Sequence, residues 1–225
     1  MSQSIVRQLV VKDLMIMRNF VMLYWLGGFL SVAFVVLASG EVASTIGSIL
    51  FIAAMAGAGV HALFQTIVEE KIKMNLPFIM SLPVTVREYT SAKLIANLLI
   101  FGSVWLTLSA ASFVVFVGDD GMPVGSMPFL SIVLVGILAA YTVMLTITVV
   151  TASQGYAIFA TVLGNLGLQA LLWYIADLYP VRSFIGGNEA VWNTTVVSIL
   201  CIFIAAIVGM LVLAVVLQFR KKDFI

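Results

Sequence analysis

Residues 129–151 read FLSIVLVGILAAYTVMLTITVVT, a run of 23 positions without a charged side chain. A helix that crosses the hydrocarbon core of a bilayer needs about 20 mostly apolar residues. Such a helix also satisfies its backbone hydrogen bonds internally, which the surrounding lipid cannot do. This stretch therefore predicts a membrane-spanning helix, and it sets the scale for interpreting the rest of the chain.

Five further runs have a similar length and hydropathy, and we expect spans near residues 20–39, 46–67, 93–117, 156–177 and 194–218. The composition agrees, because 63% of the residues are hydrophobic and 9% are charged, against about 25% charged in soluble domains. The first run exceeds the roughly 7–15-residue core of a secretory signal, so we interpret it as a retained span. The sequence predicts an all-α integral membrane protein with six transmembrane helices in a single transmembrane domain, residues 1–225.

The basic residues fall almost entirely on one side of these spans. With the N-terminus inside, ten of the eleven Lys and Arg residues lie in cytoplasmic segments, and only Arg182 lies outside. Lys and Arg in short loops are retained on the cytoplasmic side of a membrane. We therefore expect both termini in the cytoplasm and the chain in the cytoplasmic (inner) cell membrane.

Residues 1–19 have the pattern of an amphipathic helix. Arg7, Lys12 and Arg18 fall largely on other faces than the apolar residues. The apolar residues recur at helical spacing: Ile5, Val6, Leu9, Val10, Leu14 and Met17. This pattern predicts a short N-terminal helix at the membrane interface.

The largest predicted cytoplasmic segment is residues 69–92, between the second and third spans. Pro77 and Pro83 prevent one continuous helix there. Thr85-Val86-Arg87-Glu88 has the T-x-x-E spacing of a capping box, which starts a helix directly after Pro83. The third helix should therefore begin before the membrane and project into the cytoplasm.

This segment also carries a family resemblance. EEKIKMNLPFIMSLPVTVREYTSAKLIAN, residues 69–97, resembles the corresponding segment of the type-2 permeases of ATP-binding-cassette transporters. VVKDLMIMRNF, residues 10–20, is similar to the N-terminal helix of that family through Lys12-Asp13-Leu14. One position departs from the pattern, because Val86 stands where a basic residue is common and Arg87 follows it, which leaves the subfamily open.

The resemblance implies a mechanism in which a coupling helix within residues 69–92 rests in a groove of a separate cytoplasmic ATPase. Two permease chains, either two copies or a pair of paralogues, would then enclose the route of an exported hydrophobic or amphipathic cargo such as a peptide, drug or lipid. The residues that match the family pattern are the implied coupling residues: Glu69, Glu70, Ser81, Leu82, Pro83, Arg87, Glu88 and Lys93.

The chain lacks the phosphate-binding motif of an ATPase. A G-x-x-x-x-G-K-[ST] loop needs a Gly-Lys pair, and no such pair occurs in the sequence. ATP and Mg²⁺ are therefore expected on the partner ATPase, and we expect no catalytic residue, cofactor or metal site on this chain. Cys201 is the only cysteine, so no internal disulfide can form.

Two rows of small and polar residues follow i+4 spacing within the spans. Gly57, His61 and Gln65 form one row, and Thr161, Asn165 and Gln169 form the other. Polar side chains on a lipid-embedded helix should face protein or water. The rows either line the translocation path or the seam of a dimer, or they make ordinary hydrogen bonds between helices.

Two other classes of function remain open. Glu69-Glu70 resembles the acidic pair of some intramembrane enzymes, but the Arg expected after it is missing and His61 is the only histidine. A channel or structural subunit is the other alternative, although no filter-like loop is evident.

Residues 179–193 are rich in Pro, Gly and aromatic residues, and this segment is a candidate to re-enter the membrane edge.

Overall fold

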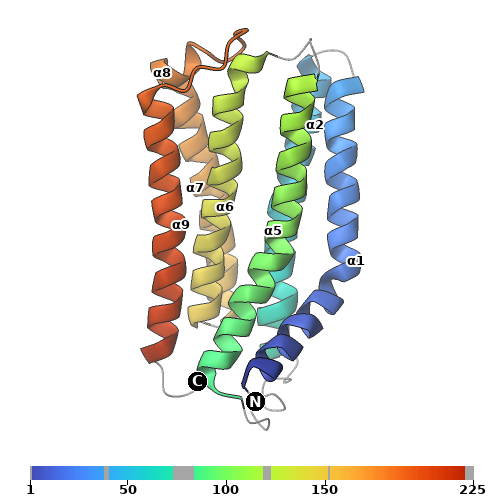
Figure 1. The fold of residues 1–225 in the computed structure, drawn as a ribbon, viewed down its shortest axis with the longest axis vertical. Helices are drawn as coiled ribbons and strands as arrows, with labels where there is room; N and C mark the ends of the chain where they lie inside the picture. Colours follow the sequence, from blue (N-terminus) through green and yellow to red (C-terminus); the bar gives the residue numbers. More distant parts are fainter. Residues whose placement is uncertain (1, 38–40, 73–83, 119–122, 152, 221–225) are drawn as a thin grey trace.

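The computed structural model describes residues 2–37, 41–72, 84–118, 123–151 and 153–220, and none of these residues lies in a β-strand. Six long helices run roughly along one axis (Figure 1). They are α1 (Ser2–Leu37), α2 (Glu41–Leu63), α5 (Val86–Gly118), α6 (Met127–Thr151), α7 (Gln154–Asp177) and α9 (Thr194–Arg220). Among the described residues, six helical stretches are long and apolar enough to cross a membrane, which confirms the predicted all-helical, multi-pass architecture.

Short helical turns join or extend these helices. The π-helix η1 (Phe64–Val68) and α3 (Glu69–Ile72) continue α2 without a break. The 3₁₀ turn η2 (Val124–Ser126) leads into α6, and α8 (Tyr179–Arg182) follows α7. The predicted spans agree with the helices to within a few residues at most ends, and the largest difference is at the start of α1.

Helix α1 is continuous through the boundary predicted at residues 19 and 20. Its first part is inclined to the rest (Figure 1), so the predicted N-terminal helix and the first span form one bent helix of 36 residues. One apolar face of the first part is covered by protein, whereas Val11, Met15 and Ile16 are exposed. Leu9 and Val10 pack with Val84, Ala92 and Ala96, at the start of α5.

The capping box predicted at the start of the third span is confirmed. The Glu88 N–H donates to Thr85 Oγ1 at 3.2 Å, and the Thr85 N–H donates to Glu88 Oε2 at 2.9 Å. These two reciprocal bonds satisfy backbone donors that have no partner inside the helix. Helix α5 accordingly begins at Val86 and extends for 33 residues.

Replacing Thr85 by Ala should lower the free energy of unfolding by about 1 kcal/mol, because the N-cap acceptor is removed. Amide hydrogen exchange should also become faster at Glu88, whose N–H loses its partner. Thr194→Ala is the matched control, since α9 is capped instead by Asn193, which accepts from the Val196 N–H. Equal exchange at Glu88 in the wild type and in Thr85→Ala would contradict this role of the cap.

The long helices form two groups of three. Helices α1, α2 and α5 pack mainly against one another, and α6 packs mainly against α7 and α9. Figure 1 shows α5 and α6 as the neighbouring helices of the two groups. The junction contains Tyr141 of α6, which stacks on Phe101 of α5 with ring centroids 3.9 Å apart.

Gly59 of α2 makes this junction possible. A Cβ atom at Gly59 would lie 2.8 Å from Cδ2 of Tyr141, closer than real Cβ contacts allow. The Tyr141 hydroxyl donates to the Asn97 carbonyl at 3.0 Å, and Tyr141 is only 1% exposed. One large side chain of α6 is thus enclosed by two helices of the other group.

Segment 178–193 lies across the end of the α6, α7 and α9 group (Figure 1). The Gly125 N–H donates to the Gly187 carbonyl at 2.8 Å, and the Gly186 N–H donates to Ser126 Oγ at 3.1 Å. Gly186 has φ +83°, a conformation that glycine adopts readily. The segment lies at one end of the bundle, and its re-entry into the membrane edge stays a prediction.

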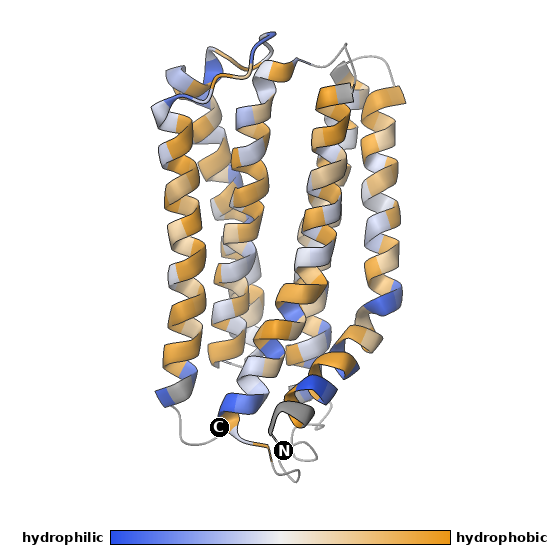
Figure 2. Cartoon of the chain, in the orientation of Figure 1, coloured by the Kyte–Doolittle hydropathy of each residue, from blue (hydrophilic) through white to orange (hydrophobic). Residues whose placement is uncertain are grey.

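The lipid-facing character of the bundle is evident from hydropathy. Hydrophobic residues cover the helices along their length, while hydrophilic ones gather near the two ends of the bundle (Figure 2). Large apolar side chains such as Leu163 and Val208 are half exposed, at 53% and 55%. Such a surface suits hydrocarbon as its surrounding medium.

Candidate functional site: a buried charge cluster between three helices

Seven polar residues from three parts of the chain meet near the end of the bundle that holds the N-terminal end of α1. Helix α5 contributes Tyr89, Lys93 and Asn97, which follow one another at i+4 and so share one face of the helix. Helix α1 contributes Lys12 and Asp13, and the η1–α3 stretch contributes Thr66 and Glu70. We call these seven residues the charge cluster.

Lys93 is the centre of the charge cluster. Its Nζ lies 2.8 Å from Asp13 Oδ2 and 2.7 Å from Glu70 Oε1. It also donates to the Thr66 carbonyl at 2.6 Å. All three hydrogens of the ammonium group therefore have an acceptor, one from each element that surrounds it.

Lys12 and Tyr89 complete the surroundings of the two carboxylates. Lys12 Nζ lies 3.2 Å from Asp13 Oδ1 and donates to Glu70 Oε1. The Tyr89 hydroxyl donates to Glu70 Oε2 at 3.0 Å, and its ring centroid lies 5.4 Å from Lys93 Nζ. Glu70 is thus held by groups from both α1 and α5.

Burial gives the charge cluster its energetic weight. Asp13 is 0% exposed, Lys93 1% and Glu70 6%, whereas the Lys12 side chain is 38% exposed. Two carboxylates and two ammonium groups make the set formally neutral. A buried charge is tolerated only when it is paired and hydrogen-bonded, because its desolvation costs several kcal/mol. Each buried charge of the cluster therefore needs its oppositely charged partners to stay in place.

The pKa of Glu70 reflects this balance. Burial alone would raise the pKa of its carboxyl, but the ammonium groups of Lys93 and Lys12 outweigh burial and hold that pKa below its usual range. Glu70 is therefore ionised at neutral pH, and it attracts both lysines.

Local packing brings the three elements close enough for these contacts. Ala92 and Ala96 of α5 are fully buried beside α1, and Ala62 of α2 is fully buried against Met17 and Ile100. Small side chains let helix backbones approach closely. The π-turn of η1 changes the i→i+4 hydrogen-bond pattern just before Glu70, and such turns are frequent at functional sites.

Hydrogen bonds extend from the charge cluster to the junction of the two helix groups. Asn97 Nδ2 donates to Thr66 Oγ1 at 2.8 Å and to the Lys93 carbonyl at 2.9 Å. The Asn97 carbonyl in turn accepts from the hydroxyl of Tyr141 on α6. A continuous set of buried contacts thus connects the charged end of α5 with the second group of helices.

The implied coupling residues are distributed over several places. Glu70 and Lys93 are in direct contact within the charge cluster, and Glu88 serves the cap of α5. Glu69 is half-buried and Arg87 is exposed. Ser81, Leu82 and Pro83 lie outside the described residues, so their role stays a prediction.

The first polar row lies against α1 of the same chain. His61 Nδ1 is 3.2 Å from the Tyr24 hydroxyl, and the His61 ring centroid is 4.2 Å from that of Phe20. A Cβ atom at Gly57 would lie 3.1 Å from the Tyr24 ring, and Gln65 is half-buried. His61 therefore makes contacts between helices of one chain, as the alternative interpretation of this row expects. A role of the row in translocation stays a prediction.

The second polar row lies on α7, away from the charge cluster. Thr161 Oγ1 donates to the Ala157 carbonyl and Asn165 Nδ2 to the Thr161 carbonyl, each at 2.8 Å. Both bonds stay within α7, and Gln169 is exposed on the helix surface. Within one chain, this row is separate from the first row. Its role in lining the translocation path or the seam of a dimer stays a prediction.

Sequence reasoning missed most of the charge cluster. Five of its seven residues were not among the predicted site residues: Lys12, Asp13, Thr66, Tyr89 and Asn97. One signal was available, since Tyr89, Lys93 and Asn97 form a polar i+4 row at the start of an otherwise apolar helix. Within the described parts of the chain, no group of three His, Cys, Asp or Glu residues could hold a metal ion.

No family model, no curated protein and no solved structure matches this chain.

Proposed function

We propose that this chain is the membrane-spanning permease subunit of an ATP-binding-cassette exporter, driven by a separate cytoplasmic ATPase that binds ATP and Mg²⁺. The observation that supports this most is the charge cluster. It connects the first part of α1 with both ends of the 69–92 segment. Glu70 lies near the start of that segment, and Lys93 lies directly after its end. The resemblance of residues 69–97 to the coupling segment of type-2 permeases points to the same place.

The physical argument concerns the transmission of movement. A segment that receives force from a partner protein moves the bilayer helices only if it is rigidly attached to them. Paired buried charges hold α1, α3 and α5 together, since separating them would expose each charge without its partner. The contacts from Asn97 to Tyr141 extend this attachment to α6. A movement of the 69–92 segment would then be passed to both groups of helices.

This proposal includes the expected assembly and cargo. Two permease chains, identical or paralogous, enclose the route, and both termini face the cytoplasm beside the ATPase. The cargo is hydrophobic or amphipathic, because the spans carry few polar groups for a sugar or an ion. No chain of ionisable residues crosses the apolar centres of the described spans, which does not favour an ion-driven carrier.

The test is co-purification with an ATP-binding-cassette ATPase encoded in the same operon. Leu82→Asp and Arg87→Glu should each abolish co-purification and the stimulation of ATP hydrolysis, because they alter the proposed docking surface. Arg182→Glu is the matched control, since Arg182 is exposed and lies at the opposite end of the bundle. It should leave both readouts unchanged.

Two outcomes would contradict the proposal. If the wild-type chain neither binds nor stimulates such an ATPase, the chain is not a permease subunit. If Leu82→Asp and Arg87→Glu both retain full stimulation, the 69–92 segment is not where the ATPase docks.

A further inference from the structure

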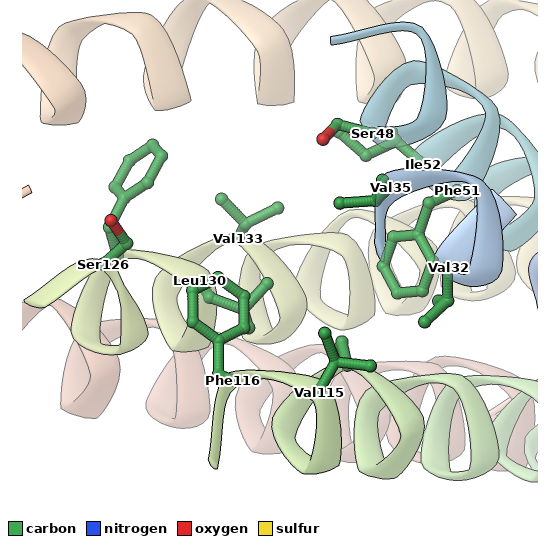
Figure 3. A pocket seen from close by; sticks show the side chains of 12 residues that line it. Val32, Val35, Ser48, Phe51, Ile52, Val115, Phe116, Ser126, Leu130 and Val133 are labelled. Atoms are coloured by element: carbon green, nitrogen blue, oxygen red, sulfur yellow. The ribbon is translucent and has the colours of Figure 1, made fainter. Parts of the chain in front are cut away.

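An apolar pocket opens between the two helix groups in the half of the bundle away from the charge cluster. It is lined by residues of α1, α2, α5, α6 and the η2 turn, among them Val32, Phe51, Val115 and Leu130 (Figure 3). Its volume is about 270 Å³. The groups are therefore in tight contact at Tyr141 and separated by a space nearer the end of the bundle that carries α8.

The lining is almost entirely apolar, and each of its three serine hydroxyls makes one hydrogen bond within the protein. Ser48 Oγ donates to the Ser44 carbonyl and Ser112 Oγ to the Ser109 carbonyl, each at 2.8 Å. Ser126 Oγ accepts from the Gly186 N–H. The other lining residues are Val, Ile, Leu and Phe, and none is charged. A polar headgroup or an ion would find no charged partner among the described lining residues and would lose most of its hydration there.

Water is not a suitable occupant either. A buried water molecule typically needs two to four polar partners, and the three lining hydroxyls come from three different elements, α2, α5 and η2, among nine apolar side chains. An empty space would forfeit the dispersion contacts of the side chains around it. An apolar occupant restores these contacts and requires no hydrogen bond.

The pocket is continuous with the surface that faces lipid. Ser48 and Ile52 line it and are also exposed on α2, next to Ile49, which is 60% exposed. The volume lies just below the roughly 300–1,000 Å³ of pockets that hold drug-sized ligands, so a single flexible chain fits better than a bulky cargo. Hydrocarbon chains are the apolar groups present in excess at this depth.

We propose that this pocket binds one acyl chain of a membrane phospholipid, which inserts between the two helix groups from the leaflet at the α8 end. The headgroup stays outside, and recognition is by shape and apolar contact alone. The bound chain supports α2 and α5 on one side and α6 on the other, and so holds the groups apart in this half of the bundle. This site is independent of the proposed ATPase coupling.

The test uses a phospholipid with a photoactivatable diazirine in its acyl chain, with the full-length protein in lipid nanodiscs. After irradiation, adducts are mapped by mass spectrometry. Adducts are expected at Phe51, which is only 8% exposed, and at Val133 as well as at the exposed Leu163. Adducts confined to exposed positions such as Leu163 in the wild type would overturn the proposal.

Two variants close the pocket in different ways. Ser48→Trp places a large ring at its opening on α2, and Ser112→Leu fills its interior. Both should lose the adducts at Phe51 and Val133 and keep those at Leu163. Ser198→Trp is the matched control, because Ser198 is also an exposed serine near the same end of a span, on α9. Adducts at Phe51 that persist in both pocket variants would overturn the proposal.

A second arm identifies the source of the chain. A diazirine fatty acid in an unlabelled bilayer is compared with the labelled phospholipid at equal abundance. The phospholipid should label Phe51 and Val133 at least as strongly as the fatty acid. Labelling of these residues by the fatty acid alone would overturn the assignment to a phospholipid.

Discussion

Replacing Lys93 by Met should lower the free energy of unfolding by about 3–5 kcal/mol, one of the two largest effects we expect from a single substitution. The reason is that Asp13 and Glu70 would keep their buried positions and lose the ammonium group between them. Lys12 would remain as their counter-charge, and it is partly exposed to solvent. Unfolding in detergent, followed by tryptophan fluorescence, would measure the change.

The control for this substitution is an ion pair on the surface. Arg182 Nη1 lies 3.0 Å from Asp177 Oδ1, and the side chains of Asp177 and Arg182 are 78% and 72% exposed. Arg182→Met should therefore cost at most about 1 kcal/mol, as is typical of exposed pairs. Equal effects of Lys93→Met and Arg182→Met would show that burial of the charge cluster contributes nothing to stability.

A double variant separates pairing from packing. Asp13→Asn together with Lys93→Met removes one charge of each sign, so its cost should be smaller than the sum of the single costs. Full additivity would contradict direct coupling between the two side chains.

Replacing Tyr141 by Ala should lower the free energy of unfolding by about 3–5 kcal/mol, because a fully buried aromatic side chain leaves a cavity. Its stacking on Phe101 and its hydrogen bond to the Asn97 carbonyl would also be lost. The junction would then depend on Phe101 and on Trp105 of α5, whose Nε1–H donates to the Leu134 carbonyl of α6 at 2.8 Å. The same unfolding measurement applies, and cross-linking of cysteines placed on α5 and α6 would report the looser contact.

Tyr141→Phe isolates the hydroxyl. It keeps the ring and removes one hydrogen bond, so it should cost about 1 kcal/mol. Tyr174→Ala is the control for aromatic size, since Tyr174 is 66% exposed on α7 and should matter little. A Tyr141→Ala variant as stable as Tyr174→Ala would contradict the role of this junction.

The parts of the fold that depend on local sequence could be predicted. Hydropathy over about 20 residues places a span because the bilayer has a fixed thickness. The capping box at Thr85 and Glu88 predicted the start of α5, because both partners lie within one turn of the helix. The predicted N-terminal helix and the first span form one continuous helix because nothing in residues 15–22 breaks a helix.

The charge cluster could not be predicted in this way. Asp13 and Lys93 are 80 residues apart, and no local pattern states that two helices will place them face to face. Lys93 was singled out through a family resemblance, whereas Asp13 appeared only as part of a short sequence element. The π-turn of η1 has no recognised sequence signal either, so its position near Thr66 came from the structure alone.

The first half of α1 has a consequence for biosynthesis. The ribosome makes Asp13 long before Lys93, so the nascent chain carries this carboxylate while α5 does not yet exist. Its apolar neighbours Leu9 and Val10 also lack their surroundings until Ala92 and Ala96 have been made. The amino-terminal end of the chain, although synthesised first, can therefore take its final place only after the third span has been inserted.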